Sequence, residues 1–323
     1  MGITSVGVLT AGGDAPGMNA AVRAVVRTAL ALGMRAFGIR RAYQGLAGGE
    51  IAELGARDVG GIIQRGGTIL QTARFPDFAR PEAQQAALRQ LRAKGVDALV
   101  AIGGDGTMRG AAALHGLGFP VIGVPASIDN DVYGTDISIG VDTALNTILD
   151  AIDKLRDTAS SHQRAFIVET MGRDCGHLAL MSGIISGAEM ILIPEQEASV
   201  EEVAAAVRGA HERGKTHAIV VVSEGAKLHA NALRDRLAAM HPGFDLRVTI
   251  LGHVQRGGSP SAWDRLIAAR LGVAAVERLQ KGESGVMVGL KAREIIGTPL
   301  AEVAGRQRGP DLEYYRMARM LAR

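Results

Sequence analysis

Several residue types are scarce in this chain of 323 residues. The single cysteine, Cys175, excludes an intramolecular disulfide framework. Aromatic residues make up only 3% of the sequence, so there is no obvious stacking platform for bases, and no basic stripe is present. We therefore expect no nucleic-acid partner. The formal net charge is only +3, with positive residues dispersed among acidic ones, which leaves small anions as plausible ligands.

The sequence also lacks a long uninterrupted apolar run. Its most apolar stretch, residues 178–194, is broken by Glu189 and suits a buried helix and strand better than a membrane span. The first residues lack the basic region and apolar core of a secretory signal. These absences predict a cytoplasmic protein with no membrane partner. Ten prolines against 43 glycines, without low-complexity tracts, predict many tight turns rather than disordered linkers.

Strand-like apolar segments alternate with segments of helical periodicity along both halves of the chain, which predicts β-α-β units and parallel sheets. The length exceeds the roughly 250–300 residues of a usual single core, so two lobes are expected. The predicted fold class is α/β, with two similar Rossmann-like lobes of mainly parallel sheets flanked by helices and the active site in the cleft between them. The predicted domains are 1–140 with 256–305, and 141–255 with 306–323. The predicted strands are 6–10, 35–39, 98–102, 121–124, 165–168, 190–193, 218–222, 246–250 and 285–290, the last returning to the first sheet. Helices are predicted after Pro16 and over 81–93, 108–114, 141–155, 178–186, 200–212, 232–240 and 262–279.

Three glycine- and aspartate-rich runs follow predicted strands. They are Gly12-Gly13-Asp14, Gly103-Gly104-Asp105-Gly106-Thr107 and Asp129-Asn130-Asp131. Because ligands of open α/β sheets bind beyond the carboxyl ends of the strands, these runs predict a phosphate site. Asp105 is a candidate ligand for Mg²⁺, and Thr107 could cap a helix or donate to a phosphate. The structural alternative is a set of tight turns, with Asp14 acting only as a helix N-cap.

The third run places two carboxylates two residues apart, beside the hydroxyl of Ser127. One carboxylate could act as a base and the other as an organiser. Deprotonation of an alcohol, with neutralisation of the transferring phosphate, is the general logic of phosphoryl transfer. Asx-turn chemistry is the structural alternative for this run.

Four further motifs occur in order with these runs: Thr72-Ala73-Arg74-Phe75-Pro76, Ser160-Ser161-His162-Gln163-Arg164, Gly172-Arg173 and Gly252-His253-Val254-Gln255-Arg256-Gly257-Gly258-Ser259-Pro260. Together they resemble the motifs of bacterial ATP-dependent 6-phosphofructokinases over nearly the whole chain. The resemblance implies transfer of the γ-phosphoryl group of Mg-ATP to the 1-hydroxyl of fructose 6-phosphate, which gives fructose 1,6-bisphosphate and ADP in glycolysis.

The resemblance also implies that the first predicted domain binds ATP and that the second binds fructose 6-phosphate. It further implies roles for individual residues. Catalytic roles fall on Asp129 as the base, with Ser127, Arg173 and Gly12, and Asp105 serves Mg²⁺. The implied nucleotide site comprises Gly12, Arg74, Phe75, Gly104, Asp105, Gly106 and Thr107. The implied fructose 6-phosphate site comprises Ser127, Asp129, Arg164, Met171, Gly172, Arg173, Glu224, Arg247, His253 and Arg256.

Assembly and regulation are implied in the same way. Arg164 and Arg247 match residues that reach the 6-phosphate in a neighbouring subunit of a homotetramer, although a plain salt-bridge role is an alternative. An allosteric site for effectors such as ADP and phosphoenolpyruvate is implied at Arg23, Arg27, Arg156, Gly187, Glu189, Arg213 and Lys215. The match is incomplete at two places: Ala56 replaces a basic residue, with Arg57 next to it, and Ala126-Ser127 replaces the usual Gly-Thr pair.

Two other functions compete with this interpretation. Pyrophosphate-dependent relatives carry a bulky acidic residue at the position of Gly106 and a lysine near Ala126, and this chain has neither. A noncatalytic nucleotide sensor with the same fold is the second alternative, since a fold does not establish an activity.

Overall fold

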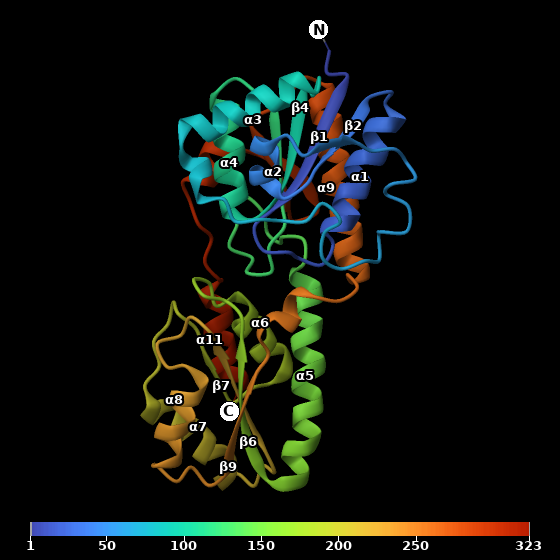
Figure 1. Ribbon diagram of the computed structural model, residues 1–323. Coiled ribbons are helices and arrows are strands. Elements are labelled where there is room, and N and C mark those ends of the chain that lie inside the picture. Colours follow the sequence, from blue (N-terminus) through green and yellow to red (C-terminus); the bar gives the residue numbers. More distant parts are fainter. Residues whose placement is uncertain (1, 323) are drawn as a thin grey trace. The chain divides into compact units, whose positions relative to one another are not determined.

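The computed structural model describes residues 2–322 (Figure 1). The chain divides into two compact units. The first comprises the residues up to Thr143 together with Arg256–Arg308, and the second comprises Ala144–Gln255 together with the residues from Gly309 onward. The chain thus passes from the first unit to the second and back before its final segment.

Within the described residues, the first unit contains a seven-stranded sheet in the order β11-β10-β5-β4-β1-β2-β3. Its strands are β1 (Ser5–Ala11), β2 (Arg35–Ile39), β3 (Ile51–Glu53), β4 (Ala98–Gly103), β5 (Val121–Pro125), β10 (Val286–Lys291) and β11 (Glu294–Pro299). The inner strand pairs are parallel, and the edge strands β3 and β11 each pair antiparallel with their neighbour. The prediction that residues 285–290 return to the first sheet is confirmed, because β10 pairs with β5.

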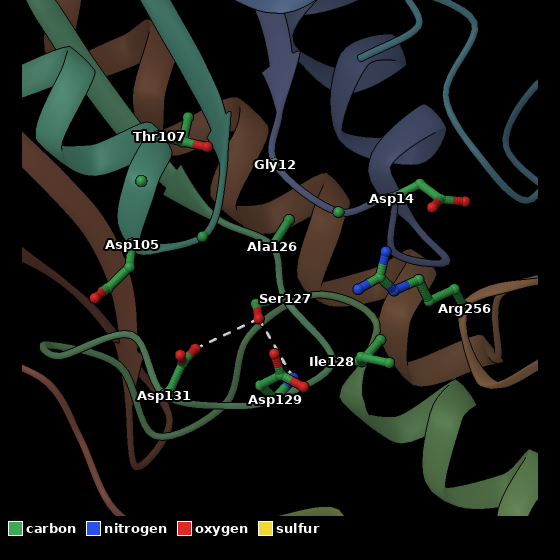
Figure 2. A pocket seen from close by; sticks show the side chains of 13 residues that line it. Gly12, Asp14, Asp105, Thr107, Ala126, Ser127, Ile128, Asp129, Asp131 and Arg256 are labelled. Carbon is green, nitrogen blue, oxygen red and sulfur yellow. Dashed lines mark hydrogen bonds between the residues drawn. The ribbon is translucent and has the colours of Figure 1, made fainter. Parts of the chain in front are cut away.

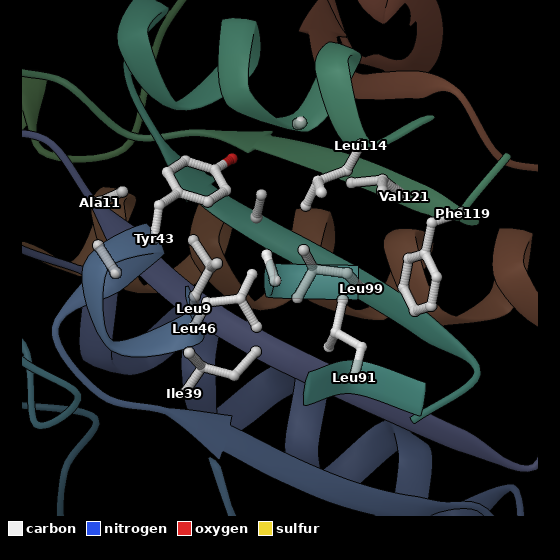
Figure 3. Close-up of a cluster of buried hydrophobic side chains, with 14 of the residues drawn as sticks. Leu9, Ala11, Ile39, Tyr43, Leu46, Leu91, Leu99, Leu114, Phe119 and Val121 are labelled. Atoms are coloured by element: carbon white, nitrogen blue, oxygen red, sulfur yellow. The ribbon is translucent and has the colours of Figure 1, made fainter. Parts of the chain in front are cut away.

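Helices cover both faces of this sheet (Figure 1). They are α1 (Met18–Ala31), α2 (Ala42–Gly48), α3 (Pro81–Ala93), α4 (Asp105–Gly116), α9 (Ala262–Gln280) and α10 (Leu300–Ala304), with a 3-10 turn, η1 (Pro76–Ala79). Figure 3 shows the buried cluster in which Leu9 and Leu99 of the sheet meet Leu46, Leu91 and Leu114 of α2, α3 and α4. This packing holds the start of α4, and with it the turn after β4, in a fixed place.

The second unit contains a smaller parallel sheet in the order β7-β8-β6-β9. Its strands are β6 (Arg164–Thr170), β7 (Met190–Leu192), β8 (Ala218–Ser223) and β9 (Asp245–Ile250). Its helices are α6 (His177–Ser186), α7 (Val200–Glu212), α8 (Ala230–Ala238), α11 (Leu312–Leu321) and most of α5 (Val141–His162). The 3-10 turn η2 (Gly252–Arg256) follows β9 and ends with the first residue of the return to the first unit. One buried cluster joins α7 and α8 to the sheet.

The α/β fold class with mainly parallel sheets flanked by helices is therefore confirmed. The sequence interpretation did not include β3, β11, α2, α10 or α11, which are short or lie at an edge. The residues that the structure describes contain no helix that is both long and apolar enough to cross a membrane.

Candidate active site

The turns after β1 and β4 lie next to each other because these strands are parallel neighbours, with Ala11 opposite Gly103. Gly12 has a φ of 84°, a left-handed conformation that favours glycine. A Cβ atom on Gly103 would overlap the carbonyl oxygen of Ala11. Glycine at these positions therefore lets the two turns approach closely and leaves their backbone open to a ligand.

The residues at which helices α1 and α4 begin decide whether Asp14 and Thr107 act as helix N-caps. Helix α1 begins at Met18 with Gly17 as its N-cap, so the interpretation of Asp14 as the N-cap is wrong. Helix α4 begins at Asp105 with Gly104 as its N-cap, so Thr107 lies in the first turn and is not the cap. The Thr107 hydroxyl is buried and has no hydrogen-bond partner within residues 2–322, which leaves it available to a ligand.

The three predicted runs line one cavity of about 180 Å³ in the first unit (Figure 2). Its lining consists of Gly12, Gly13, Asp14, Gly104, Asp105, Gly106, Thr107, Ala126, Ser127, Ile128, Asp129, Asp131 and Arg256. The structure thus brings together residues that the sequence separates by more than 100 positions. The cavity combines carboxylates, two hydroxyl-bearing side chains, open backbone and one guanidinium group.

Ser127 lies between the two carboxylates of the third run (Figure 2). Its hydroxyl donates to Oδ1 of Asp131 at 3.4 Å and accepts the backbone N–H of Asp129 at 3.3 Å. The residue between them, Asn130, has a φ of 54°, is 3% exposed and bonds the backbone of Asp136 and Ser138. These bonds reach six and eight residues along the chain and are not those of an Asx-turn, which spans two residues. Asn130 thus fixes the loop from within, while both aspartates line the cavity.

Asp105 is a largely buried carboxylate at the start of α4. Its side chain is 12% exposed, and Arg109 and Gln307 each donate to Oδ2 at 3.4 Å. Burial raises the pKa of Asp105, and the negative charge of Asp131 raises it further. Oδ1 of Asp105 is buried and has no hydrogen-bond partner in the described part of the chain.

These features fit Mg²⁺ in one specific way. Among residues 2–322 there is no group of three or more His, Cys, Asp or Glu side chains that could hold a metal by itself. Mg²⁺ is commonly bound by one or two carboxylates, water and the phosphates of a substrate, which suits a cavity-lining Asp105 with one orphaned carboxylate oxygen. Asp105 would hold the ion together with the ligand.

A second cavity, of about 650 Å³, shares Gly12, Gly106 and Thr107 with the first. Its lining is mostly apolar and comprises Ala11, Gly12, Tyr43, Ala73, Arg74, Phe75, Pro76, Phe78, Ala79, Gln84, Gly106, Thr107, Arg109, Gly110 and Ala113. The predicted residues Arg74 and Phe75 are among them. An elongated ligand with an apolar end and an anionic end would span both cavities.

Aromatic side chains gather at this second cavity although they are rare in the sequence. The rings of Tyr43 and Phe78 stack with their centroids 4.2 Å apart, and Phe75 lies 6.3 Å from Phe78. The Tyr43 hydroxyl donates to the carbonyl of Thr107 at 2.7 Å. The sequence analysis missed Tyr43 and Phe78, because a low overall content of aromatic residues does not show whether those few residues lie together in the folded chain.

In the second unit, predicted residues meet where β6 and β8 end. The N–H of Gly172 donates to Oε1 of Glu224 at 3.4 Å, and the N–H of Met171 donates to Oε1 of Gln255 at 3.2 Å. Arg173 is exposed beside them, and His253 is exposed on η2. Gln255, which is 0% exposed, was not singled out from the sequence, although it lies within the Gly252–Pro260 motif.

Arg164 and Arg247 lie on the adjacent strands β6 and β9 and share one partner. Asp245 accepts from Arg164 at 3.3 Å and from Arg247 at 2.7 Å. The salt-bridge alternative for both arginines is therefore present, but the ion pairs are half exposed and contribute little to stability. A phosphate could compete with Asp245 for the two guanidinium groups.

The residues of the implied effector site fall in both units. In the second, Lys215 pairs with Glu189 at 2.9 Å, and Arg156 bonds the carbonyl of Ser186 next to Gly187. Glu189 and Arg213 line a cavity of about 300 Å³. In the first, Arg23 and Arg27 lie one turn apart on α1. His217, which the sequence did not single out, bonds Ser160 at 2.9 Å, and burial lowers its pKa.

Comparisons with known proteins agree with this geometry. The family model described as Phosphofructokinase matches residues 5–279. A Thermus thermophilus protein named ATP-dependent 6-phosphofructokinase 1 is 53% identical over 322 residues, which cover 98% of this chain and 99% of that protein. The structure of phosphofructokinase from Saccharomyces cerevisiae superposes with a TM-score of 0.87 at 38% identity and covers 94% of this chain. This chain spans 45% of the yeast chain.

A pyrophosphate-dependent phosphofructokinase from Marinobacter aquaeolei superposes with a TM-score of 0.87, over 97% of this chain and 86% of that one. Its sequence identity is 22%, so this likeness concerns the fold alone.

Proposed function

Because the chain belongs to the phosphofructokinase family, we propose that it transfers the γ-phosphoryl group of ATP to the 1-hydroxyl of fructose 6-phosphate, in the glycolytic reaction that yields fructose 1,6-bisphosphate and ADP. The observation that carries the proposal is the pair of joined cavities in the first unit, one mostly apolar and one lined by carboxylates and open backbone. ATP has the matching chemistry, with an aromatic base at one end and phosphates at the other.

In this proposal the base of ATP enters the cavity beside Phe75 and Tyr43, and the phosphates lie against the turns at Gly12 and Gly104–Thr107. Backbone N–H groups at the start of α4 favour negative charge. Mg²⁺, held by Asp105 and the phosphates, would neutralise part of the charge on the transferring group. Arg256, which lines the same cavity, and Arg173 would supply the remaining positive charge.

Asp129 is the proposed base. It accepts the proton of the sugar hydroxyl as that oxygen bonds the γ-phosphorus, while the bond from the γ-phosphorus to the bridging oxygen breaks and ADP leaves with that oxygen. Ser127 accepts the N–H of Asp129 and donates to Asp131, and so orients the segment. Serine retains the hydroxyl of the threonine that is usual in relatives, so this arrangement survives the substitution.

The proposed fructose 6-phosphate site uses Met171, Gly172, Arg173, Glu224, His253 and Arg256. Arg164 and Arg247 would contact the 6-phosphate bound to a neighbouring subunit of a homotetramer. The effector residues around Glu189 and Lys215, with Arg23 and Arg27, would bind anionic effectors such as ADP or phosphoenolpyruvate. The proposal retains the sequence-based prediction of a cytoplasmic protein.

The residues shared by the two cavities favour ATP over pyrophosphate as the phosphoryl donor. Gly106 lines both of them, and a Cβ atom there would meet only Nη2 of Arg109, at 3.8 Å. A bulky acidic residue at this position would close the passage between them. Pyrophosphate has no group that would use the apolar cavity.

A coupled assay of ADP release tests the proposal. We expect turnover that requires ATP and fructose 6-phosphate together with Mg²⁺, and little or none with pyrophosphate in place of ATP. ATP binding without sugar-dependent turnover would identify a nucleotide sensor instead. Turnover with pyrophosphate alone would overturn the choice of phosphoryl donor.

The apolar cavity offers a separate prediction. A Cβ atom on Gly110 would lie 2.5 Å from Cε2 of Tyr43, so Gly110→Ala should displace that ring from the cavity wall. Overpacking of this kind costs about 1–3 kcal/mol. We expect the KM for ATP to rise about tenfold, while kcat at saturating ATP stays within about twofold of wild type.

Gly116→Ala is the matched control for this variant. Gly116 lies at the end of the same helix, α4, and a Cβ atom there would meet nothing within 4 Å. Initial rates at varied ATP should leave this control at the wild-type KM. An unchanged KM for Gly110→Ala would separate the apolar cavity from nucleotide binding.

A further inference from the structure

Asp264 is a buried carboxylate whose hydrogen-bond donors include no charged group. It lies in the first turn of α9 and is 0% exposed. Its Oδ1 accepts the N–H of Gly140 at 2.8 Å. Its Oδ2 accepts the N–H of Thr143 at 2.8 Å and the Thr143 hydroxyl at 2.5 Å. One carboxylate on α9 thus binds the chain at the start of α5.

A second set of hydrogen bonds reinforces this connection. The N–H of Ser261 donates to the Thr143 hydroxyl at 2.9 Å, and the Ser261 hydroxyl donates to Asp142 at 2.5 Å. Ser261 is also the N-cap of α9, where its hydroxyl accepts the N–H of Asp264. The first turns of α5 and α9 are therefore joined through side chains, which we call the Asp264 clamp (Asp142, Thr143, Ser261 and Asp264).

Gly140, which donates to Asp264 of the clamp, is next in sequence to a residue that supports the lining of the polar cavity. Gly140, which Asp264 binds, follows Ile139. The carbonyl of Ile139 accepts the N–H of Ser127 at 3.1 Å, and its N–H donates to the carbonyl of Pro125 at 3.1 Å. Residue 139 therefore pairs with the chain on both sides of Ala126, immediately before the segment that carries Asp129.

A charged group is a costly choice for packing alone. Burial of an ionised carboxylate carries a desolvation penalty, and burial raises the pKa of Asp264. An apolar side chain would fill the same space without that penalty. The carboxylate does what an apolar side chain cannot, because it orients two backbone N–H groups and one hydroxyl at once.

We propose that Asp264 is a positioning residue for phosphoryl transfer: it holds residues 139–143 in the register that keeps Ser127 and Asp129 aligned in the cavity. This inference rests on the proposed function for its kinetic consequence. Its structural consequence, the ordering of residues 125–143, does not depend on that function.

Two variants break the clamp in different ways. Asp264→Asn keeps the size of the side chain but turns an NH₂ group toward one of its donors. Thr143→Val keeps the shape of Thr143 and removes the hydroxyl that joins Asp264 to Ser261. Thr143→Ser restores the hydroxyl and serves as the rescue.

Ser199→Ala is the matched control for loss of stability. It removes a helix cap in the second unit, where Ser199 accepts the N–H of Glu202 at 3.1 Å. Loss of a cap costs about 0.5–2 kcal/mol, so this variant reports the effect of lower stability without a change at the clamp.

Hydrogen exchange of the ligand-free protein is the first readout. We expect peptides within 125–143 to exchange faster in Asp264→Asn and Thr143→Val, while peptides within 104–116 keep their protection. Thr143→Ser and Ser199→Ala should match wild type in both regions. Unchanged exchange in 125–143 for both clamp variants would overturn the proposal, whatever the catalytic result.

Steady-state kinetics is the second readout. Misplacement by about 1 Å can cost about 10²-fold in rate, so kcat should fall about 10- to 100-fold in both clamp variants. The KM for ATP should stay within about threefold, because the apolar cavity does not touch the clamp. If wild type shows no sugar-dependent turnover, the proposed function fails and the exchange result still decides the clamp. Faster exchange with an unchanged kcat would remove Asp264 from any role in the reaction.

Discussion

Asp129→Asn should lower kcat by about 10²–10⁴-fold, the range for loss of a general base, with little change in the affinity for ATP. The amide is nearly the same size as the carboxylate but cannot accept the proton of the sugar hydroxyl. Asp129 lines the polar cavity and not the apolar one, so the nucleotide should still bind. Steady-state rates with both substrates varied, together with direct titration of ATP, measure the two effects separately.

Asp136→Asn is the matched control, since Asp136 is a carboxylate of the same loop that does not line the cavity. Its Oδ2 accepts the N–H of Ala292 at 2.6 Å, and the amide oxygen of asparagine can keep that bond. We expect kcat within about twofold of wild type for this control. A kcat for Asp129→Asn that matched the control would exclude Asp129 as the base.

Asp105→Asn should lower kcat/KM by about 10²-fold or more and at the same time stabilise the ligand-free protein. The loss of activity follows from removal of the anionic ligand, because a bound metal contributes several kcal/mol of charge stabilisation in the transition state. The gain in stability follows from the raised pKa of Asp105, which means that its ionised form is disfavoured in the folded protein.

The pH dependence has a definite sign. A carboxyl group whose pKa is raised by folding adds stability below its unfolded value of about 3.9 and loses that contribution as the pH rises through its folded pKa. The free energy of unfolding of Asp105→Asn should therefore exceed that of wild type at pH 7.5, and the difference should shrink as the pH falls toward about 4. Urea unfolding in the presence of a chelator measures both values.

Asp77→Asn controls for the general effect of removing a negative charge. Asp77 is an exposed carboxylate of the first unit, with 59% of its side chain accessible, and it pairs with Arg80. Its replacement should leave both the activity and the free energy of unfolding at pH 7.5 close to those of wild type, because exposed ion pairs contribute little. Equal stability of Asp105→Asn and wild type at every pH would show that burial does not penalise this carboxylate.

Most of the secondary structure could be predicted from patterns of neighbouring residues. Helices α3 and α7 and strand β2 occupy the predicted ranges, because proline at a helix start, a capping serine and apolar periodicity are signals within a few residues. Helix α8 begins two residues earlier than predicted. The N–H of Ala230 at its start donates to Glu169, which is distant in sequence and gave no local signal.

The order of the motifs was enough to recognise the family, and their place after strands was enough to expect phosphate chemistry at Gly12, Asp105 and Asp129. These inferences depend on short segments whose conformation follows from their own residues. In many sequences, glycine in a turn predicts a close approach of the backbone, and a carboxylate after a strand predicts a polar group at the edge of the sheet.

Tertiary structure decided which groups share a cavity and which ones support it. Tyr43 reaches Thr107, and Asp264 reaches Gly140 and Thr143, across 64, 124 and 121 positions in the sequence. Such contacts arise because parallel strands bring distant turns to one edge and because buried polar groups must find partners wherever the packing places them. A pattern of neighbouring residues cannot report them, so the apolar cavity and the clamp emerged only from the folded chain.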